Sequence, residues 1–245
     1  MYIEKTIYSG KMLEVEVHKG FVIDKKKHRK PRRKKTKEKK KVINEINAKK
    51  HVIRLIHANF TERDLAVTLS YSKDTLPSNL EEAKKDFSKY IDRIKYHLKK
   101  KGLPAPKYIG VIEYGQKNKN LHHHLIISGD IDRDVLEILW TKINKGRANS
   151  RRLQEDDFGF EGIAKYMLKS PEGKKRYSRS KNLKKPVVKV KKYKYTRKKV
   201  WDLAHSQGGY ELEKEFKGYK MCEFKTFVDE MLGLIFIKAK LKKRE

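Results

Sequence analysis

The sequence predicts an α+β fold in which helices cover an antiparallel sheet. Three observations support this class: short apolar runs rich in β-branched residues, amphipathic segments with helical spacing, and the order in which the two alternate. In the middle of the chain that order is strand, long helix, two strands joined by a polar turn, helix, edge strand and helix. Consecutive strands joined by a short turn pair antiparallel, which predicts the direction of the sheet.

Each expected element has its own local pattern. Residues 64–71 (DLAVTLSY) form a short, largely apolar, β-rich run that is typical of a buried strand. Ser78 and Glu81 have the spacing of a capping box at the start of the long helix. Asp132 is the expected N-cap of the following helix. The remaining expectations are strands over 107–114, 121–128 and 151–154, and helices over 42–60, 132–143 and 160–168.

Composition divides the chain into three parts. Residues 1–44 are expected to be a basic N-terminal extension, with a short hairpin over 1–24 that closes near Gly20. Residues 45–185 hold the alternating strands and helices, and residues 186–245 form a basic C-terminal lobe. In this lobe the pattern KVKKYKY, from Lys189 to Tyr195, predicts an edge strand protected by lysines.

The net charge is +32 at pH 7, and two segments carry most of it. Residues 25–41 contribute +12 and residues 174–199 contribute +14, which leaves +6 for the rest of the chain. Concentrated positive charge attracts polyanions, of which nucleic acid is the usual one. Charge alone leaves DNA, RNA and a merely solvated charge run open. Tyr193 and Trp201 stand in or beside the second segment, where they could stack on unpaired bases or pack on the domain.

Two absences in the sequence exclude whole classes of protein. Cys222 is the single cysteine, so no disulfide framework can form within the chain. No apolar run reaches the roughly 18 residues of a membrane span, and no signal-peptide pattern occurs at the N-terminus. The sequence therefore predicts a soluble cytoplasmic protein without a membrane partner.

Three consecutive histidines form the first candidate site. Side chains alternate along a strand, so His122 and His124 share one face, about 7 Å apart along the chain, and His123 points to the other. Glu113 on the preceding strand can reach the same ion if the two strands form a hairpin. Two imidazole nitrogens and one carboxylate oxygen suit Mn²⁺, Mg²⁺ or Zn²⁺. The alternative is an incidental polar strand that binds no metal.

The second candidate site is Tyr166 with Lys169, in the last expected helix. Residues three apart share a helix face, so the phenol and the ammonium are expected side by side. A tyrosine hydroxyl has a pKa of about 10 and needs activation before it acts as a nucleophile. A Lewis-acidic metal on a phosphate would make the phosphorus more electrophilic, and Lys169 would add positive charge. Alternatively, the tyrosine lies at the rim of an ordinary amphipathic helix.

Taken together and in this order, the two sites resemble the HUH endonucleases, and within them the rolling-circle replication initiators of small plasmids and phages. The resemblance covers roughly residues 45–185 and implies a ferredoxin- or RRM-like palm. His123 departs from the usual aliphatic residue of the His-U-His motif, at a position expected to face away from the metal. The corresponding motifs are Val67–Tyr71, His122–His124 and Tyr166–Lys169, with Glu113 where many such initiators place a carboxylate ligand.

The resemblance implies a single-tyrosine enzyme that nicks single-stranded or hairpin origin DNA through a 5′-phosphotyrosyl intermediate and later rejoins the strands. Tyr166 and Lys169 would be catalytic, and His122, His124 and Glu113 would hold a divalent metal, Mn²⁺ or Mg²⁺ above all. No Gly-x-x-x-x-Gly-Lys-Ser/Thr loop occurs, so a host helicase and polymerase are the expected partners. No oligomeric state is predicted. The expected DNA-binding residues are Lys174, Lys175, Arg176, Arg179, Lys181, Lys184 and Lys185.

Motif order separates this subclass from its neighbours. In relaxases the tyrosine precedes the histidines, whereas here Tyr166 follows His124 by 42 residues. Single-tyrosine transposases share the present order and are the first alternative, although they are typically smaller and lack long basic arms. The second alternative is a basic nucleic-acid-binding protein without enzymatic activity.

Overall fold

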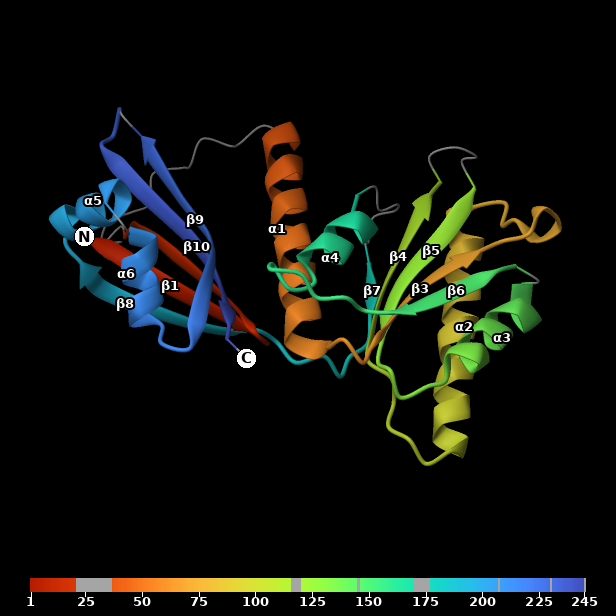
Figure 1. Cartoon of the computed structure of the whole chain (residues 1–245). Helices are drawn as coiled ribbons and strands as arrows, with labels where there is room; N and C mark the ends of the chain where they lie inside the picture. The colour runs from red at the N-terminus through yellow and green to blue at the C-terminus, as the bar shows by residue number, and fades with distance from the viewer. Residues whose placement is uncertain are drawn as a thin grey trace, which may run out of the picture. The chain divides into compact units, whose positions relative to one another are not determined.

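The computed structural model describes residues 1–20, 37–115, 120–144, 146–169, 177–206, 208–229 and 231–244. The chain forms two compact units: unit 1 comprises Met1–Ala58, Asp157–Gly159 and Lys185–Glu245, and unit 2 comprises Asn59–Asp156 and Phe160–Lys184. Each unit contains one five-stranded sheet with helices packed on it (Figure 1). All the strand pairs are antiparallel, which confirms the expected α+β class.

Unit 2 contains the strands and helices in the order that the sequence predicts. Its sheet has the strand order β6-β3-β5-β4-β7, with β5 at the centre. Helices α2 and α3 cover one face, where the apolar core lies, and α4 lies on the opposite face (Figure 1). The elements of unit 2 are β3 (Leu65–Ser70), the 3₁₀ turn η1 (Lys73–Thr75), α2 (Leu80–Lys100), β4 (Tyr108–Tyr114), β5 (Leu121–Ile127), α3 (Arg133–Asn144), β6 (Ala148–Arg152), α4 (Glu161–Met167) and β7 (Ser178–Arg179).

The long helix α2 begins one residue later than its expected cap. Asn79, and not Ser78, is the N-cap, and its side chain accepts a hydrogen bond from the Glu82 backbone N–H at 2.9 Å. The Glu82 carboxylate in turn accepts from the Ser78 N–H at 2.7 Å. The capping box is therefore shifted by one position, because asparagine is as good an N-cap as serine and the next residue in register is also a glutamate. One face of α2 is buried against the sheet through Ala83, Phe87, Tyr90, Ile91, Ile94 and Leu98.

Unit 1 is built on a sheet with the strand order β8-β1-β2-β10-β9. Helices α5 and α6 share an apolar core with this sheet. The strand β8 lies at one edge and is exposed along most of its length, as its lysine pattern predicts. The elements of unit 1 are β1 (Tyr2–Ser9), β2 (Met12–Lys19), α1 (Lys37–Asn59, its last residue falling in unit 2), β8 (Val187–Tyr195), α5 (Arg197–His205), α6 (Gly208–Glu215), β9 (Tyr219–Asp229) and β10 (Leu234–Lys243).

The N-terminal hairpin exists, but its expected turn is wrong. Ser9 pairs with Met12, so the chain turns at Gly10 and Lys11, and Gly20 lies at the open end. Gly10 has a φ of 60°, and a Cβ there would lie 2.0 Å from the carbonyl oxygen of His57. Only glycine combines this backbone conformation with that close approach. Gly20 attracted the prediction as a loop signal, but it follows the second strand.

The compact units divide the chain differently from the three segments that composition suggests. The first strand β1 pairs with β8, and β2 pairs with β10, so the two ends of the chain share one sheet. The helix α1 extends over the expected helix at 42–60 and belongs to unit 1 up to Ala58. Most of the basic run at 25–41 lies outside the described residues. Among the helices that the structure describes, none is long and apolar enough to cross a membrane.

Candidate active site

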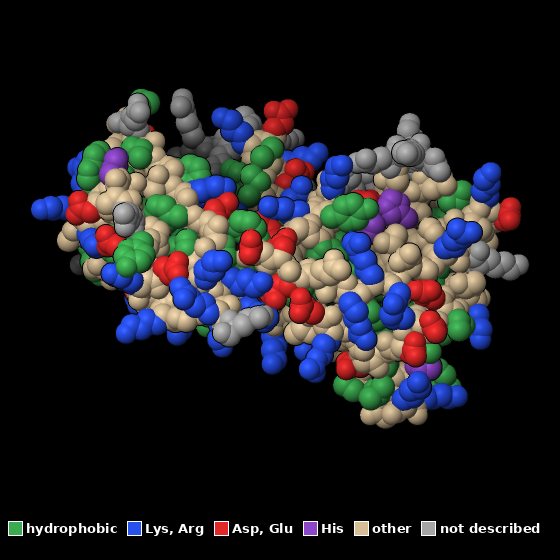
Figure 2. Space-filling model, in the orientation of Figure 1, with side chains coloured by type: hydrophobic (Ala, Val, Ile, Leu, Met, Phe, Trp, Pro, Cys, Tyr) green, Lys and Arg blue, Asp and Glu red, His purple; other side chains and the backbone are tan. Residues whose placement is uncertain are grey.

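The sheet of unit 2 brings three ionisable side chains to one face. Glu113 on β4 lies directly opposite His122 on β5, and Thr68 on β3 lies directly opposite His124. Side chains alternate along a strand, so His122 and His124 point to the same side of the sheet, as expected. That side is the one on which α4 lies (Figure 1). Histidine side chains reach the surface near β4 and β5, with Lys and Arg side chains nearby (Figure 2).

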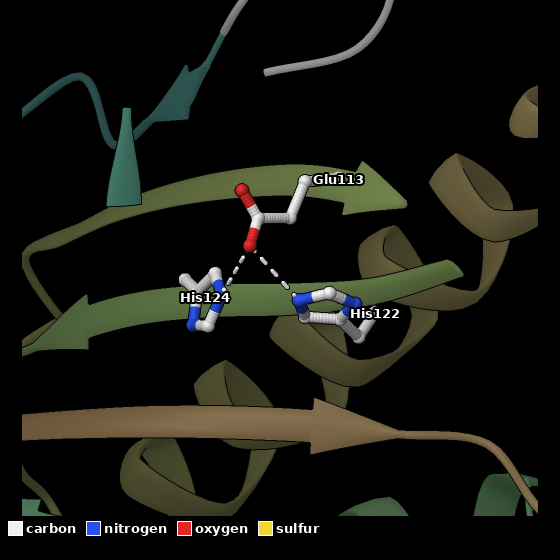
Figure 3. Close-up of side chains that lie close together, drawn as sticks. All are labelled: Glu113, His122 and His124. Atoms are coloured by element: carbon white, nitrogen blue, oxygen red, sulfur yellow. Dashed lines mark hydrogen bonds and ion pairs between the residues drawn. The ribbon is translucent and has the colours of Figure 1, made fainter. Parts of the chain in front are cut away.

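The three side chains converge on one carboxylate oxygen. His122 Nε2 lies 3.0 Å and His124 Nε2 lies 2.9 Å from Oε1 of Glu113 (Figure 3). The candidate ligand atoms all lie within 4.8 Å of one another. Metal–ligand bonds of about 2.1 Å place two ligands of one ion up to about 4.2 Å apart, so small side-chain movements would fit a cation. The group is therefore able to hold a metal ion, although two nitrogens and one oxygen do not identify which one.

Burial prepares His124 for a role as a ligand. Its side chain is 5% exposed, compared with 20% for His122 and 13% for Glu113. Burial is the largest effect on the pKa of His124 and lowers it; the neighbouring Glu113 acts in the opposite direction. A lowered pKa favours the neutral imidazole, which is the form that binds metals. Thr68 Oγ1 lies 3.4 Å from His124 Nδ1 and helps to orient the ring.

His123 faces the opposite side of the sheet, as the alternation predicts. It is fully buried and stacks on Phe87 with ring centroids 5.3 Å apart. Its Nε2 lies 2.8 Å from the Tyr71 hydroxyl. Burial lowers the pKa of His123 to about 3, with smaller contributions from the two neighbouring histidines. His123 is therefore a neutral core residue, which explains why a histidine is tolerated at this position.

Tyr166 on α4 lies over the histidines. The buried side of α4 consists of Glu161, Ala164 and Met167, whereas Tyr166 is 58% exposed. The Tyr166 ring centroid lies 5.2 Å from that of His124, with the planes at 70°. The fold therefore brings the candidate nucleophile and the candidate metal ligands, which are distant in sequence, to the same place.

The shared helix face expected for Tyr166 and Lys169 is wrong. The helix α4 ends at Met167 with Leu168 as its C-cap, so Lys169 lies beyond the helix, where its N–H donates to the Tyr166 carbonyl oxygen at 3.2 Å. The expectation failed because it extended the helical period past the point where the backbone leaves it. Lys169 is exposed, and its catalytic role stays a prediction.

The expected DNA-binding residues are only partly described. Lys174, Lys175 and Arg176 lie outside the described residues. Arg179 is in β7, the edge strand that pairs with β4, where it lies opposite Ile109. Their role in DNA binding stays a prediction. The other three expected residues are exposed: Lys181, Lys184 and Lys185.

Sequence reasoning missed the side of the site that β6 contributes. A pocket of about 340 Å³ lies beside His124 and Tyr166, and Asn149 and Arg151 are part of its lining. Both stand on β6, which the sequence predicts only as an edge strand. The alternation of residues 148–152 could have shown that Asn149 and Arg151 share a face. Which face they share follows only from the pairing of β6 with β3.

Comparison with known proteins gives one match. Residues 64–171 match the model of a family described as replication-associated protein, of the ORF2 type. The matched segment runs from β3 to the end of α4 and contains Glu113, the histidines, Tyr166 and Lys169. No curated protein and no solved structure matches. The family match supports a Rep-type replication initiator with DNA as its partner.

Proposed function

We propose that the protein is a replication initiator that nicks single-stranded origin DNA through Tyr166. The observation that carries the proposal is the position of the Tyr166 ring, 5.2 Å from the ring of His124 in a group of two histidines and one glutamate. The family match over the same residues supports it independently. Two basic segments, with +12 and +14 of the net charge, suit a polyanionic substrate.

The chemistry is a transesterification at phosphorus. The Tyr166 oxygen forms a bond to the scissile phosphorus as the bond to the 3′ oxygen breaks. The phenol gives up a proton and the departing 3′ oxygen gains one, so the products are a 5′-phosphotyrosyl link and a free 3′-OH. A divalent cation held by Glu113, His122 and His124 would stabilise negative charge on the phosphate. The 3′-OH can prime synthesis, and a later attack of a 3′-OH on the phosphotyrosine rejoins a strand without ATP.

The chain's own residues supply position and charge. The β5 strand holds His124 rigidly because it is the central strand of the sheet and its neighbour His123 is anchored in the core. Tyr166, in contrast, is exposed near the end of a short helix, where a DNA strand can reach it. Lys169 follows directly and would place its ammonium near the same phosphate. A rigid ligand group and an accessible nucleophile suit repeated cleavage and rejoining.

Replacing Tyr166 with phenylalanine tests the proposal. The wild-type chain is incubated with end-labelled random single-stranded oligonucleotides and Mn²⁺, and covalent adducts are separated on a denaturing gel. Wild-type protein is expected to give a labelled adduct, and Tyr166→Phe is expected to give none, because the phenol oxygen forms the covalent bond. The loss should exceed 10³-fold, as for other covalent nucleophiles.

The matched control is Tyr114→Phe, because Tyr114 is also an exposed tyrosine of unit 2. It should retain the adduct at the wild-type level. Adduct formation by Tyr166→Phe would show that another residue is the nucleophile. Absence of any adduct from the wild-type chain, with binding intact, would favour the alternative of a nucleic-acid-binding protein without enzymatic activity.

A further inference from the structure

The pocket beside His124 lies between the sheet of unit 2 and helix α4. Its volume is about 340 Å³, at the small end of the roughly 300–1,000 Å³ range of small-molecule sites. Two kinds of wall meet in it. The wall from the sheet is polar, with Thr68, Asn149 and Arg151, and the wall from α4 includes the apolar side chains of Ile163 and Met167.

The polar wall belongs to the same sheet face as the candidate metal ligands. On β3, Thr68 lies opposite His124 on one side and opposite Asn149 on the other. Arg151, two residues along β6, points to the same face as Asn149. Adjacent strands lie about 4.8 Å apart, so Asn149 is displaced by about 10 Å from His124 across the sheet. The pocket therefore extends the site sideways, away from Glu113.

Asn149 and Arg151 are available to a ligand. Both are exposed, and among the described residues no hydrogen bond or ion pair engages either side chain. The other arginines nearby are used differently: Arg133 donates to the Ser150 carbonyl oxygen, and Arg152 donates to that of Arg63. Arg151 is also close enough to His124 to act on its charge, since it lowers the pKa of that imidazole. A free guanidinium at this place suits an anion.

We propose that this pocket binds one unpaired nucleotide next to the scissile phosphate. The base enters between α4 and β6, with Ile163 and Met167 against its face and the Asn149 amide at its edge. Arg151 binds the phosphate of the same nucleotide. An amide offers both donor and acceptor to a base edge, and a guanidinium offers a fork of donors that matches phosphate oxygens. This inference rests on the proposed function, and it adds a determinant of sequence preference to it.

A single-stranded substrate fits this arrangement better than a duplex. A base enters such a pocket only when it is unstacked and unpaired, which costs a few kcal/mol in a duplex and little in a single strand. Single-stranded segments are recognised by splayed bases that contact side chains at their faces and edges. The pocket would therefore read one base directly, while the basic segments bind phosphates without regard to sequence.

Selection of bound oligonucleotides tests the pocket without any need for cleavage. The full chain carrying Tyr166→Phe is mixed with a single-stranded DNA pool with 20 randomised positions, and bound molecules are sequenced. We expect a base preference that includes one position lost in Asn149→Ala, while the other preferred positions remain. We expect Arg151→Gln to weaken binding about tenfold with the preferences unchanged, and to reduce the salt dependence by about 0.7 of a counterion.

Two further variants exclude trivial explanations. Arg152→Gln removes the same charge from the adjacent residue, which faces the other side of β6, and should leave affinity and base preference near those of the parent. Arg151→Lys keeps the charge and should restore the salt dependence. The inference is overturned if Arg151→Gln and Arg152→Gln behave alike, if Asn149→Ala keeps every preference, or if the parent selects no base at all.

The experiment separates this inference from the proposed function. If the selection gives the expected pattern but the wild-type chain forms no adduct, the nucleotide pocket stands and the nicking activity fails. If the wild-type chain forms adducts and the selection shows no effect of Asn149→Ala, the enzyme stands and the pocket assignment fails.

Discussion

Three adjacent histidines in this chain have two different environments. His122 and His124 share an oxygen of Glu113 on one side of the sheet, and His123 packs among Phe87, Trp140 and Tyr71 on the other. The residue type is the same, and the strand alternation alone assigns the roles. The core position costs the protein a buried polar ring, because His123 Nδ1 has no partner among the described residues. The hydrogen bond at Nε2 offsets part of that cost.

The bond between Tyr71 and His123 leads to a prediction on stability. Tyr71→Phe removes the hydroxyl that lies 2.8 Å from His123 Nε2 and leaves this buried nitrogen without a partner. The free energy of unfolding should fall by about 1–3 kcal/mol, measured by urea denaturation. Tyr96→Phe is the control, since Tyr96 is 61% exposed on α2, and it should change stability by less than about 0.5 kcal/mol. Equal effects of the two variants would show that the Tyr71 bond contributes nothing.

At the scale of single elements, the sequence predicts unit 2 well because its signals are local. The apolar face of α2, the buried strand β3 and the hairpin of β4 and β5 each have a period that a short window contains. The positions of Glu113, His122 and His124 follow from that period and a single hairpin register. Arg151 was missed because its position depends on β6 pairing with β3, which is 80 residues earlier in the chain. The helix end before Lys169 was missed because no glycine or proline marks it.

The edge strand β8 contains an irregularity that the sequence does not announce. Its register with β1 shifts between Tyr2 and Glu4, and Tyr193 at that place has a φ of 63°. A non-glycine residue in this region is strained by about 1–2 kcal/mol. Nearby, the buried Glu4 carboxylate accepts hydrogen bonds from Lys194 and Tyr195, which holds the chain in the bulged path.

Glycine substitutions along β8 should therefore have opposite signs. Tyr193→Gly is expected to leave the free energy of unfolding unchanged or to raise it by up to about 1 kcal/mol, because the relief of strain offsets the added chain entropy and the side chain is 65% exposed. Lys192→Gly, at an adjacent position with ordinary φ, should lower it by about 0.5–1 kcal/mol. Thermal unfolding of the two variants compares them directly. A larger loss for Tyr193→Gly would mean that the Tyr193 side chain is needed for folding.

At the scale of the whole molecule, pairing between distant segments decides the organisation. The strand β1 starts at Tyr2 and pairs with β8, which starts at Val187, so unit 1 is closed by residues from both ends of the chain. No local pattern announces such pairing, which is why composition suggested an extension and a separate lobe. Unit 2 contains the entire set of candidate catalytic residues and nearly all of the segment that matches the replication-associated family.

This division predicts where a metal ion acts on the chain. A cation that binds the folded site at 100 times its Kd stabilises that site by about 2.7 kcal/mol. Hydrogen exchange measured by mass spectrometry, with Mn²⁺ and with EDTA, should show slower exchange with Mn²⁺ in β4 and β5 of unit 2. Exchange in β1, β2 and β10 of unit 1 should not change, because none of the three candidate ligands lies in that unit. Glu113→Gln weakens a carboxylate ligand without changing its size and should remove the protection. Protection that persists in Glu113→Gln, or that spreads equally over both sheets, would mean that Mn²⁺ binds elsewhere and that the convergence of the two histidines on Glu113 serves only the packing of the sheet.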